Sequence, residues 1–291
     1  VQARAQAIPL LGIGVGVPGI VDPGENNLVS APALGWKEVP LKQIWTQRFS
    51  VSVLVENKAR AAAMAEATHG CAQEATSFVY VNIGTDVRSS VEAAVVTNGL
   101  PYRGARGLAV DAGHMILDPQ GPLCSCGQRG CWQALVDVDR EVELAQLRLA
   151  AGETSILQKY GADGNPALEH RAIHQAAVER DPLALEVVSS LTLNHVLGIV
   201  NLVHIFDPEL VVIGLASVAL PPPYQARIQI MTGMQEFDIP AAVRQQLMRR
   251  GVAPPTIVYA EHGPEACMFG AAALLVDEFL RMPPTPEAKQ L

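Results

Sequence analysis

Residues that could bind a metal are concentrated in the middle of the chain, at His114, Cys124, Cys126 and Cys131. Three thiolates and one imidazole match the number and softness of ligands that tetrahedral zinc prefers. Four protein ligands leave no coordination position for water, so the pattern favours a structural zinc ion over a catalytic one. Gly127 and Gly130 allow the loop to turn tightly enough to bring Cys131 back to the ion. The sequence therefore predicts a structural zinc site.

The alternative for this segment is three reduced cysteines packed as small hydrophobic side chains beside an unrelated histidine. A disulfide framework fits poorly, because the chain has five cysteines, an odd number, and three of them are clustered. Cys71 and Cys267 stand apart. The other histidines have no ligand neighbours and are predicted to be surface or hydrogen-bonded core residues: His69, His170, His174, His195, His204 and His262.

The elements that must position this loop predict a mixed α/β fold. Apolar or β-branched runs predict strands over 10–17, 51–55, 78–83, 90–96, 210–213 and 256–260. Helical spacing predicts helices over 41–49, 58–69, 138–150, 166–179, 182–205 and 265–280. Asn57 is placed to cap the second of these helices. Asn98-Gly99 predicts a tight hairpin turn.

Composition narrows the classes of function. The chain has 291 residues, a length that favours two lobes over a single core. Its formal net charge is −8. Its arginines are scattered, so no nucleic acid is expected to bind this chain alone. Polar residues such as Asn194 and His204 interrupt the longest apolar run, so no membrane span is expected. The first nine residues lack a signal-peptide pattern, which predicts a cytoplasmic protein.

The zinc segment also resembles a known family. His114 through Cys131 is similar, almost position for position, to the zinc motif of the ROK family of sugar-dependent repressors and kinases. Other signatures of the family follow in the family's order: Gly14-Val15-Gly16-Val17-Pro18-Gly19-Ile20-Val21-Asp22, Ala31-Pro32, Gly35-Trp36 and Val55-Glu56-Asn57. The resemblance runs from about Leu11 to about Phe279. The Cys131-Trp132 pair and the context of Trp36 are most similar to the xylose-repressor-like branch.

This resemblance implies an actin/hexokinase-like (ribonuclease H-like) α/β fold of two lobes, with a sugar in the cleft between them. The expected parts are the remainder of the N-terminal lobe at 1–76, the C-terminal lobe at 77–265 with the zinc loop at 113–131, a helix at 266–281 that packs back toward the N-terminal lobe, and a tail at 282–291. The N-terminal lobe is expected to be incomplete, because the family's first strand and phosphate loop are not found. The helix-turn-helix of the repressors is not found either.

The motifs for phosphoryl transfer differ from those that the resemblance implies. Kinases of the family have an aspartate base after the asparagine of Glu-Asn-Asp, and this chain has Lys58 there, a cation that cannot accept a proton while charged. The glycine-rich phosphate hairpin reads Gly84-Thr85-Asp86-Val87-Arg88-Ser89, and the adenosine-site Gly-Gly reads Gly214-Leu215-Ala216. No catalytic residue is assigned, and the chain is predicted not to be an enzyme.

The sugar contacts implied by the resemblance are also altered. Four positions that contact the sugar in the family are occupied here by Ala33, Lys58, Asp111 and Gln133, whereas Asn57 is retained. Asn57, Asp111 and Gln133 are the predicted ligand-binding residues. Mismatched partners would leave sugar hydroxyls unpaired, so hexose affinity is expected to be weak, or the ligand different. Ordinary capping or turn chemistry is the alternative role for these three residues.

The leading hypothesis is the sugar-sensing and dimerisation portion of a ROK-family transcriptional regulator of the repressor type. It would be a homodimer with a structural zinc ion and a small sugar effector, and would reach DNA through a helix-turn-helix in a full-length protein. In the family's repressors, lobe closure around an inducer moves the DNA-binding heads, which requires different affinities for two states. Two alternatives stay open: a glucokinase-like, ATP-dependent hexose kinase, and a pseudoenzyme that binds neither sugar nor nucleotide.

Overall fold

The computed structural model describes residues 10–84, 91–161, 167–216, 238–249, 251 and 253–281. The chain divides into two compact units, of which unit 1 is Val1–Tyr80, Ala94–Val110 and Ala260–Leu291, and unit 2 is Val81–Ala93 and Asp111–Tyr259. The hairpin residues 85–89 and the tail 282–291 lie outside the described residues. The lobe boundaries expected from the sequence stay a prediction.

Unit 1 is built on two parallel strands, β1 (Gly12–Val17) and β5 (Ser52–Asn57), paired from Gly12 opposite Ser52 to Val17 opposite Asn57. A three-stranded antiparallel sheet has the order β2-β3-β4. The other elements of the unit are β2 (Ile20–Val21), β3 (Leu28–Ala31), η1 (Pro32–Leu34), β4 (Trp36–Val39), α2 (Leu41–Phe49), α3 (Lys58–His69), β8 (Leu100–Pro101) and α10 (Ala266–Arg281). The helices predicted over 41–49 and 58–69 are confirmed.

One face of β1 carries only glycine, because Gly12, Gly14 and Gly16 alternate along the strand. Helix α10 lies directly on this face. A Cβ added at Gly14 would be 2.2 Å from the carbonyl oxygen of Ala271, and one added at Gly16 would be 2.0 Å from the Sγ of Cys267. The glycine-punctuated run therefore provides a surface on which a helix can approach the strand backbone closely.

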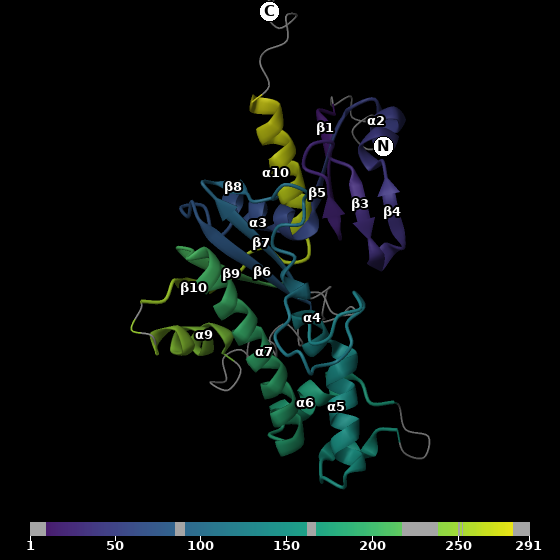
Figure 1. Cartoon of the computed structure of the whole chain (residues 1–291), viewed down its shortest axis with the longest axis vertical. Helices are drawn as coiled ribbons and strands as arrows, with labels where there is room; N and C mark the ends of the chain where they lie inside the picture. The colour runs from purple at the N-terminus through teal and green to yellow at the C-terminus, as the bar shows by residue number, and fades with distance from the viewer. Residues whose placement is uncertain are drawn as a thin grey trace, which may run out of the picture. The chain divides into compact units, whose positions relative to one another are not determined.

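Helix α10 also packs along α3 (Figure 1). A Cβ added at Gly270 would be 1.6 Å from the carbonyl oxygen of Ala61, so the two helix backbones are nearly in contact there. The buried carboxylate of Glu66 in α3 accepts hydrogen bonds from the backbone N–H groups of His262 at 2.8 Å and Glu261 at 3.2 Å. Glu66 thereby fastens the segment before α10 to α3.

A five-stranded sheet has the order β10-β9-β6-β7-β8, and β6 (Phe78–Gly84) and β7 (Val91–Thr97) contribute residues to both units. Strands β9 (Leu210–Ala216) and β10 (Thr256–Tyr259) are parallel, whereas β7 and β8 are antiparallel. Asn98 and Gly99 have φ of 53° and 72° and connect β7 to β8, so the predicted hairpin turn is confirmed.

The rest of unit 2 is mainly helical. Its elements are η2 (Ala112–His114), α4 (Trp132–Leu135), α5 (Val138–Ala150), η3 (Ile156–Lys159), α6 (His170–Val178), α7 (Pro182–Phe206) and α9 (Ile239–Met248). Helices α5, α6 and α7 pack against one another around an apolar core (Figure 1). Asp181 caps α7 by accepting the N–H of Ala184 at 3.0 Å, and it also accepts hydrogen bonds from Ser155 Oγ and the Ile156 N–H, both at 2.9 Å.

Helix α7 bears on the expectation that the chain has no membrane span. Its 25 residues are long and apolar enough to cross a membrane by length and composition, the one such helix in the part of the chain that the structure describes. Polar residues such as Asn194 lie within the helix and do not shorten it. However, 44% of its most apolar window is buried, and it packs against α4, α5, α6 and α9, as a core helix does. Such a helix is weak evidence for a membrane span.

An ion pair between a buried carboxylate and a partly exposed imidazole joins α5 to α6. Nε2 of His174 lies 2.8 Å from Oε1 of Glu141, whose side chain is 3% exposed. Burial of the imidazole acts to lower the pKa of His174, but the charge of Glu141 and its hydrogen bond outweigh burial and raise the pKa above its ordinary value of 6.5. The pair therefore links the stability of the helical region to pH.

Substitution at the glycine face of β1 should destabilise unit 1. Gly14→Ala places a methyl group against the Ala271 carbonyl, and we expect it to lower the free energy of unfolding by about 1 to 3 kcal/mol, measured by chemical denaturation. Gly263→Ala is the control, because its added Cβ would meet only the carboxylate of Glu265, at 3.4 Å. Equal denaturation midpoints for the two variants would contradict the proposed close packing.

The ion pair predicts that the effect of His174→Gln on the stability of the protein depends on pH. Because the folded-state pKa is raised, the stabilisation is fully present below the unfolded-state pKa of about 6.5 and is lost as pH rises through the folded-state pKa. We expect the difference in Tm between wild type and His174→Gln to be largest near about pH 6 and to shrink toward about pH 9. Glu141→Gln should abolish the pH dependence of this stabilisation as well. A difference that is constant with pH would argue against a charged pair.

Candidate metal centre and ligand residues

The cysteine loop folds as a tight hairpin. The backbone N–H of Cys124 donates to the carbonyl of Gln128 at 2.8 Å, and the N–H of Gly127 donates to the carbonyl of Cys124 at 2.9 Å. Gly127 has φ of 89°, a conformation that side chains disfavour. This turn fixes the backbone that carries Cys124 and Cys126.

A second turn returns the chain to the segment that follows His114. Gly130 has φ of 68°, and a Cβ added there would be 1.5 Å from the carbonyl oxygen of Asp118, so only glycine fits. The carbonyl of Gly130 accepts the N–H of Leu117 at 2.9 Å. Cys131 then pairs with Ile116 in an isolated antiparallel bridge.

The four predicted ligand atoms converge, and all lie within 4.8 Å of one another. Nδ1 of His114 is 3.6 Å from Sγ of Cys124, and Sγ of Cys126 is 3.6 Å from Sγ of Cys131. From the usual zinc bond lengths, a tetrahedral ion requires about 3.8 Å between two sulfurs and about 3.6 Å between sulfur and nitrogen. The structure therefore brings together the four side chains predicted from the sequence, in a cluster that fits a tetrahedral metal ion.

The thiols of the cluster do not ionise equally. Burial opposes ionisation of Cys124, but hydrogen bonds from the backbone and thiol of Cys126, from Cys131 and from Gln133 outweigh it and lower the pKa of Cys124 to about 6. Burial, together with hydrogen bonds to Cys126 and Cys124, raises the pKa of Cys131 to about 12. A bound dication would supply the charge needed for all three thiols to lose their protons.

Two predicted sugar ligands, Asp111 and Gln133, flank this cluster. Nε2 of Gln133, in α4, lies 3.4 Å from Sγ of Cys124 and 3.4 Å from Oγ of Ser125. Asp111 is exposed and precedes η2, where its carbonyl accepts the N–H of His114 at 3.1 Å. Its carboxylate makes no capping hydrogen bond to η2, so the capping alternative is not observed for Asp111.

The third predicted sugar ligand, Asn57, lies in unit 1, where it ends β5 and caps α3. Its Oδ1 accepts the backbone N–H of Ala59 at 2.9 Å and of Arg60 at 3.2 Å, and its Nδ2 donates to the carbonyl of Gly19 at 2.9 Å. The capping alternative is therefore observed for Asn57. These bonds tie the start of α3 to the turn after β1, at the carboxyl end of the parallel strands, where α/β sheets commonly bind ligands.

A buried ion cluster that was not predicted from the sequence adjoins Asn57. Oε1 of Glu56 lies 2.7 Å from Nε of Arg60, and its Oε2 lies 2.7 Å from Nε of Arg103. Arg60 also donates from Nη1 to the carbonyl of Gly107 at 3.2 Å. The spacing of Glu56 and Arg60 is a local signal that could have been used, whereas Arg103 is distant in the sequence and gives none.

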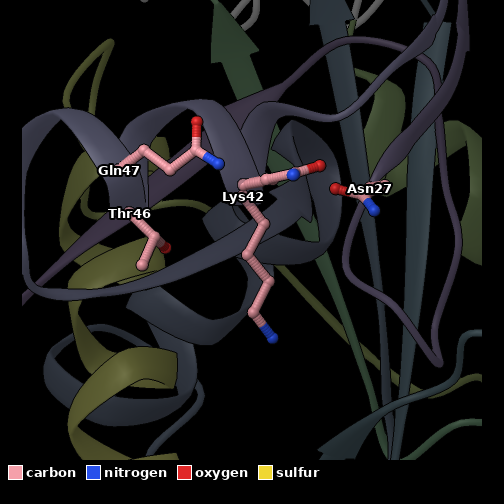
Figure 2. Close-up of a pocket in the computed structure, with 5 residues that line it drawn as sticks. Asn27, Lys42, Thr46 and Gln47 are labelled. Carbon is pink, nitrogen blue, oxygen red and sulfur yellow. The ribbon is translucent and has the colours of Figure 1, made fainter.

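A surface hollow of about 290 Å³ lies beside α2 in unit 1 (Figure 2). Its lining residues are Asn27, Lys42, Gln43, Thr46 and Gln47. Four of them belong to one face of α2, since they are spaced as neighbouring positions on a helix. None of the three predicted sugar ligands lines this hollow, so it is separate from the predicted sugar contacts.

Comparison with known proteins assigns the family. The model of the ROK family matches residues 1–278. The chain belongs to the ROK family. The xylose repressor of Bacillus subtilis is 27% identical over 273 residues, which cover 94% of this chain and 63% of the repressor. The xylose repressor of Caldicellulosiruptor bescii is 32% identical over 206 residues, which cover 70% of this chain and 50% of the repressor. The chain thus spans about half to two thirds of the length of these relatives.

Solved structures of ROK proteins confirm the fold class. The ROK glucokinase of Streptomyces griseus, in complex with glucose and AMPPNP, has a TM-score of 0.71 and 26% identity, and the match covers 94% of this chain and 84% of that one. A ROK transcriptional regulator homologous to the MLC protein of E. coli has a TM-score of 0.75 and 24% identity, covering 94% and 64%. The expected actin/hexokinase-like α/β fold is therefore confirmed. Because kinases and regulators share this fold, the fold does not decide between them.

Two of the altered kinase motifs of this ROK chain lie among the described residues. Lys58 is the first residue of α3, directly after the cap Asn57. Gly214 lies inside strand β9. In the phosphate hairpin, Gly84 ends β6, and 85–89 are outside the described residues.

The cluster of His114 and three cysteines predicts that this ROK protein contains bound zinc when it is purified. We expect elemental analysis to find one zinc per chain, and we expect Cys131→Ser, which changes a fully buried ligand, to remove the zinc and lower the Tm. Cys71→Ser is the control, because the Cys71 thiol donates to Glu66 in unit 1, outside the cluster. Full zinc content in Cys131→Ser would contradict the ligand assignment.

Proposed function

We propose that this chain is the sugar-sensing and dimerisation portion of a ROK-family transcriptional regulator of the repressor type, without kinase activity. The observation that carries the proposal is Lys58 at the first position of α3, after the cap Asn57. Transfer of a phosphoryl group to a sugar requires a group that accepts the hydroxyl proton, and a charged ammonium cannot do so. The xylose repressors among the relatives support the same conclusion.

The neighbouring carboxylate does not replace the missing base. Glu56 is 2% exposed, and its oxygens are engaged by Arg60 and Arg103. Its Oε1 also accepts the backbone N–H of Asn57 at 2.8 Å. Because both carboxylate oxygens are already engaged and the side chain is buried, Glu56 serves to fix the start of α3.

The effector that we propose is a small sugar. The S. griseus glucokinase is solved with glucose, and the relatives include xylose repressors. Asn57, Asp111 and Gln133 are the residues assigned to this effector. Regulation would require that the sugar bind two conformations with different affinity, and a helix-turn-helix in a full-length, homodimeric, cytoplasmic protein would carry the response to DNA.

The metal that we propose for the cysteine loop is zinc in a structural role. Three thiolates and an imidazole complete a tetrahedral shell, which leaves no position for a reacting water. Such an ion would hold together a loop that has little regular structure between η2 and α4. The zinc therefore contributes to stability and not to chemistry on the sugar.

A thermal-shift titration with pentoses, hexoses and N-acetylhexosamines tests this function. We expect one sugar to raise the Tm, with stabilisation of about 2.7 kcal/mol at a hundredfold excess over Kd, and we expect no further rise with Mg-ATP. No sugar should be phosphorylated in the presence of ATP. We expect Asp111→Asn to weaken the sugar-induced shift without changing the Tm of the free protein, because its carboxylate makes no cap.

The other possible results of the titration would support one of the two alternatives, the kinase or the pseudoenzyme. ATP-dependent phosphorylation of a sugar would establish a kinase with an unconventional base. If neither a sugar nor a nucleotide changes the Tm, the result would establish a pseudoenzyme. Either result would refute the sensor.

A further inference from the structure

Two histidines lie one helical turn apart at the start of α6. His170 is the first residue of the helix and His174 follows four positions later, so both side chains belong to one face. Their rings meet edge-to-face, with 6.3 Å between the ring centroids and an interplanar angle of 85°. The side chain of His174 is 36% exposed, and His170 is also partly exposed. The two imidazoles are therefore within reach of an ion from solvent.

A buried carboxylate from the neighbouring helix adjoins this pair. Helix α5 packs against α6 (Figure 1), and Oε1 of Glu141 in α5 lies 2.8 Å from Nε2 of His174. The side chain of Glu141 is only 3% exposed. The contact is bent, so Oε1 has no well-aligned hydrogen-bond donor among the described residues. A buried carboxylate oxygen without such a donor is poorly solvated, and a cation beside it is favoured.

The three side chains form a donor set that transition metals bind. Imidazole suits zinc and nickel, and two imidazoles with one carboxylate recur as metal ligands. In helix bundles, metal sites are built from side chains that project from facing helices. Three ligands leave coordination positions for water, unlike the four ligands of the cysteine loop. A divalent ion would take the place of the proton that His174 carries beside Glu141.

The spacing of the two rings fits one ion after a small adjustment. With metal–nitrogen bonds of about 2.0 to 2.1 Å, two imidazoles on one ion have ring centres about 5 Å apart, so the rings must approach by about 1 Å. Rotation about the side-chain bonds of His170 supplies this movement without displacing the helix backbone. The ligand atoms of the cysteine loop already lie within 4.8 Å of one another. The histidine site should therefore bind its ion more weakly than the loop does.

We propose that His170, His174 and Glu141 form a second metal site, which takes a divalent transition-metal ion such as zinc or nickel and joins α5 to α6. The site shares no residue with the cysteine loop. It depends neither on the sugar effector nor on the proposed structural zinc, because all three ligands come from the two helices.

Equilibrium dialysis against nickel tests the site. Untagged, zinc-loaded wild type, His170→Gln and His204→Gln are dialysed against Ni²⁺, and elemental analysis then counts both metals per chain. His204→Gln is the matched control, because it removes an exposed histidine of α7. We expect about one nickel per chain in wild type and in His204→Gln, and nickel binding at least about tenfold weaker in His170→Gln. The zinc content should be the same in all three proteins.

A second variant and a stability measurement test the buried ligand. Glu141→Gln should also lose nickel while it keeps its zinc and unfolds cooperatively. Nickel should raise the Tm of wild type and leave the Tm of His170→Gln unchanged. Wild type that binds no nickel, equal nickel binding by wild type and His170→Gln, or equal loss in His204→Gln would overturn the inference. Nickel binding that His170→Gln removes, in a protein that holds no zinc, would support this site and refute the cysteine site.

Discussion

The close approach of α10 to the glycine face of β1 is the constraint on which unit 1 depends. Without side chains at alternate positions of β1, the helix reaches the strand backbone, and from there it meets α3 at Gly270. Helix α3 is thus held along its length by α10 and at its buried carboxylate by the segment before α10. Its first turn, which begins at Lys58 after the cap Asn57, is positioned by this packing, so the place of Lys58 in the fold depends on a contact between backbones.

In unit 2 the corresponding constraint lies in the cysteine loop between η2 and α4. The loop between η2 and α4 buries few apolar side chains, and two glycine turns and a bridge hold its path. A metal ion would supply the cohesion that a small core cannot. The buried indole of Trp132 then connects the loop to α7. Helix α7 in turn packs against α5, α6 and α9, so the loop is joined to the helical core through one side chain.

The features that were predictable from the sequence are those whose determinants are local. The cluster of His114 with three cysteines, the Asn57 cap and the Asn98-Gly99 turn each depend on a few neighbouring residues, and the structure shows all three features. Metal binding by the cluster stays a prediction. The Glu56–Arg103 ion pair and the contact of Gln133 with Cys124 depend on chain folding, so spacing alone could not predict them. The helix predicted over 182–205 is observed as α7 (Pro182–Phe206), because apolar spacing along one long segment is also a local signal.

Unit 1 is assembled from segments at both ends of the described chain, with unit 2 largely between them. During synthesis, β1 emerges before unit 2, and the helix that covers its glycine face emerges after unit 2. Unit 2 is therefore complete while the glycine face of β1 is still exposed to solvent. The contacts between α10 and β1 span most of the sequence, which slows their formation because a long loop must close first. The order in which the units mature on the ribosome is thus set by where α10 falls in the sequence.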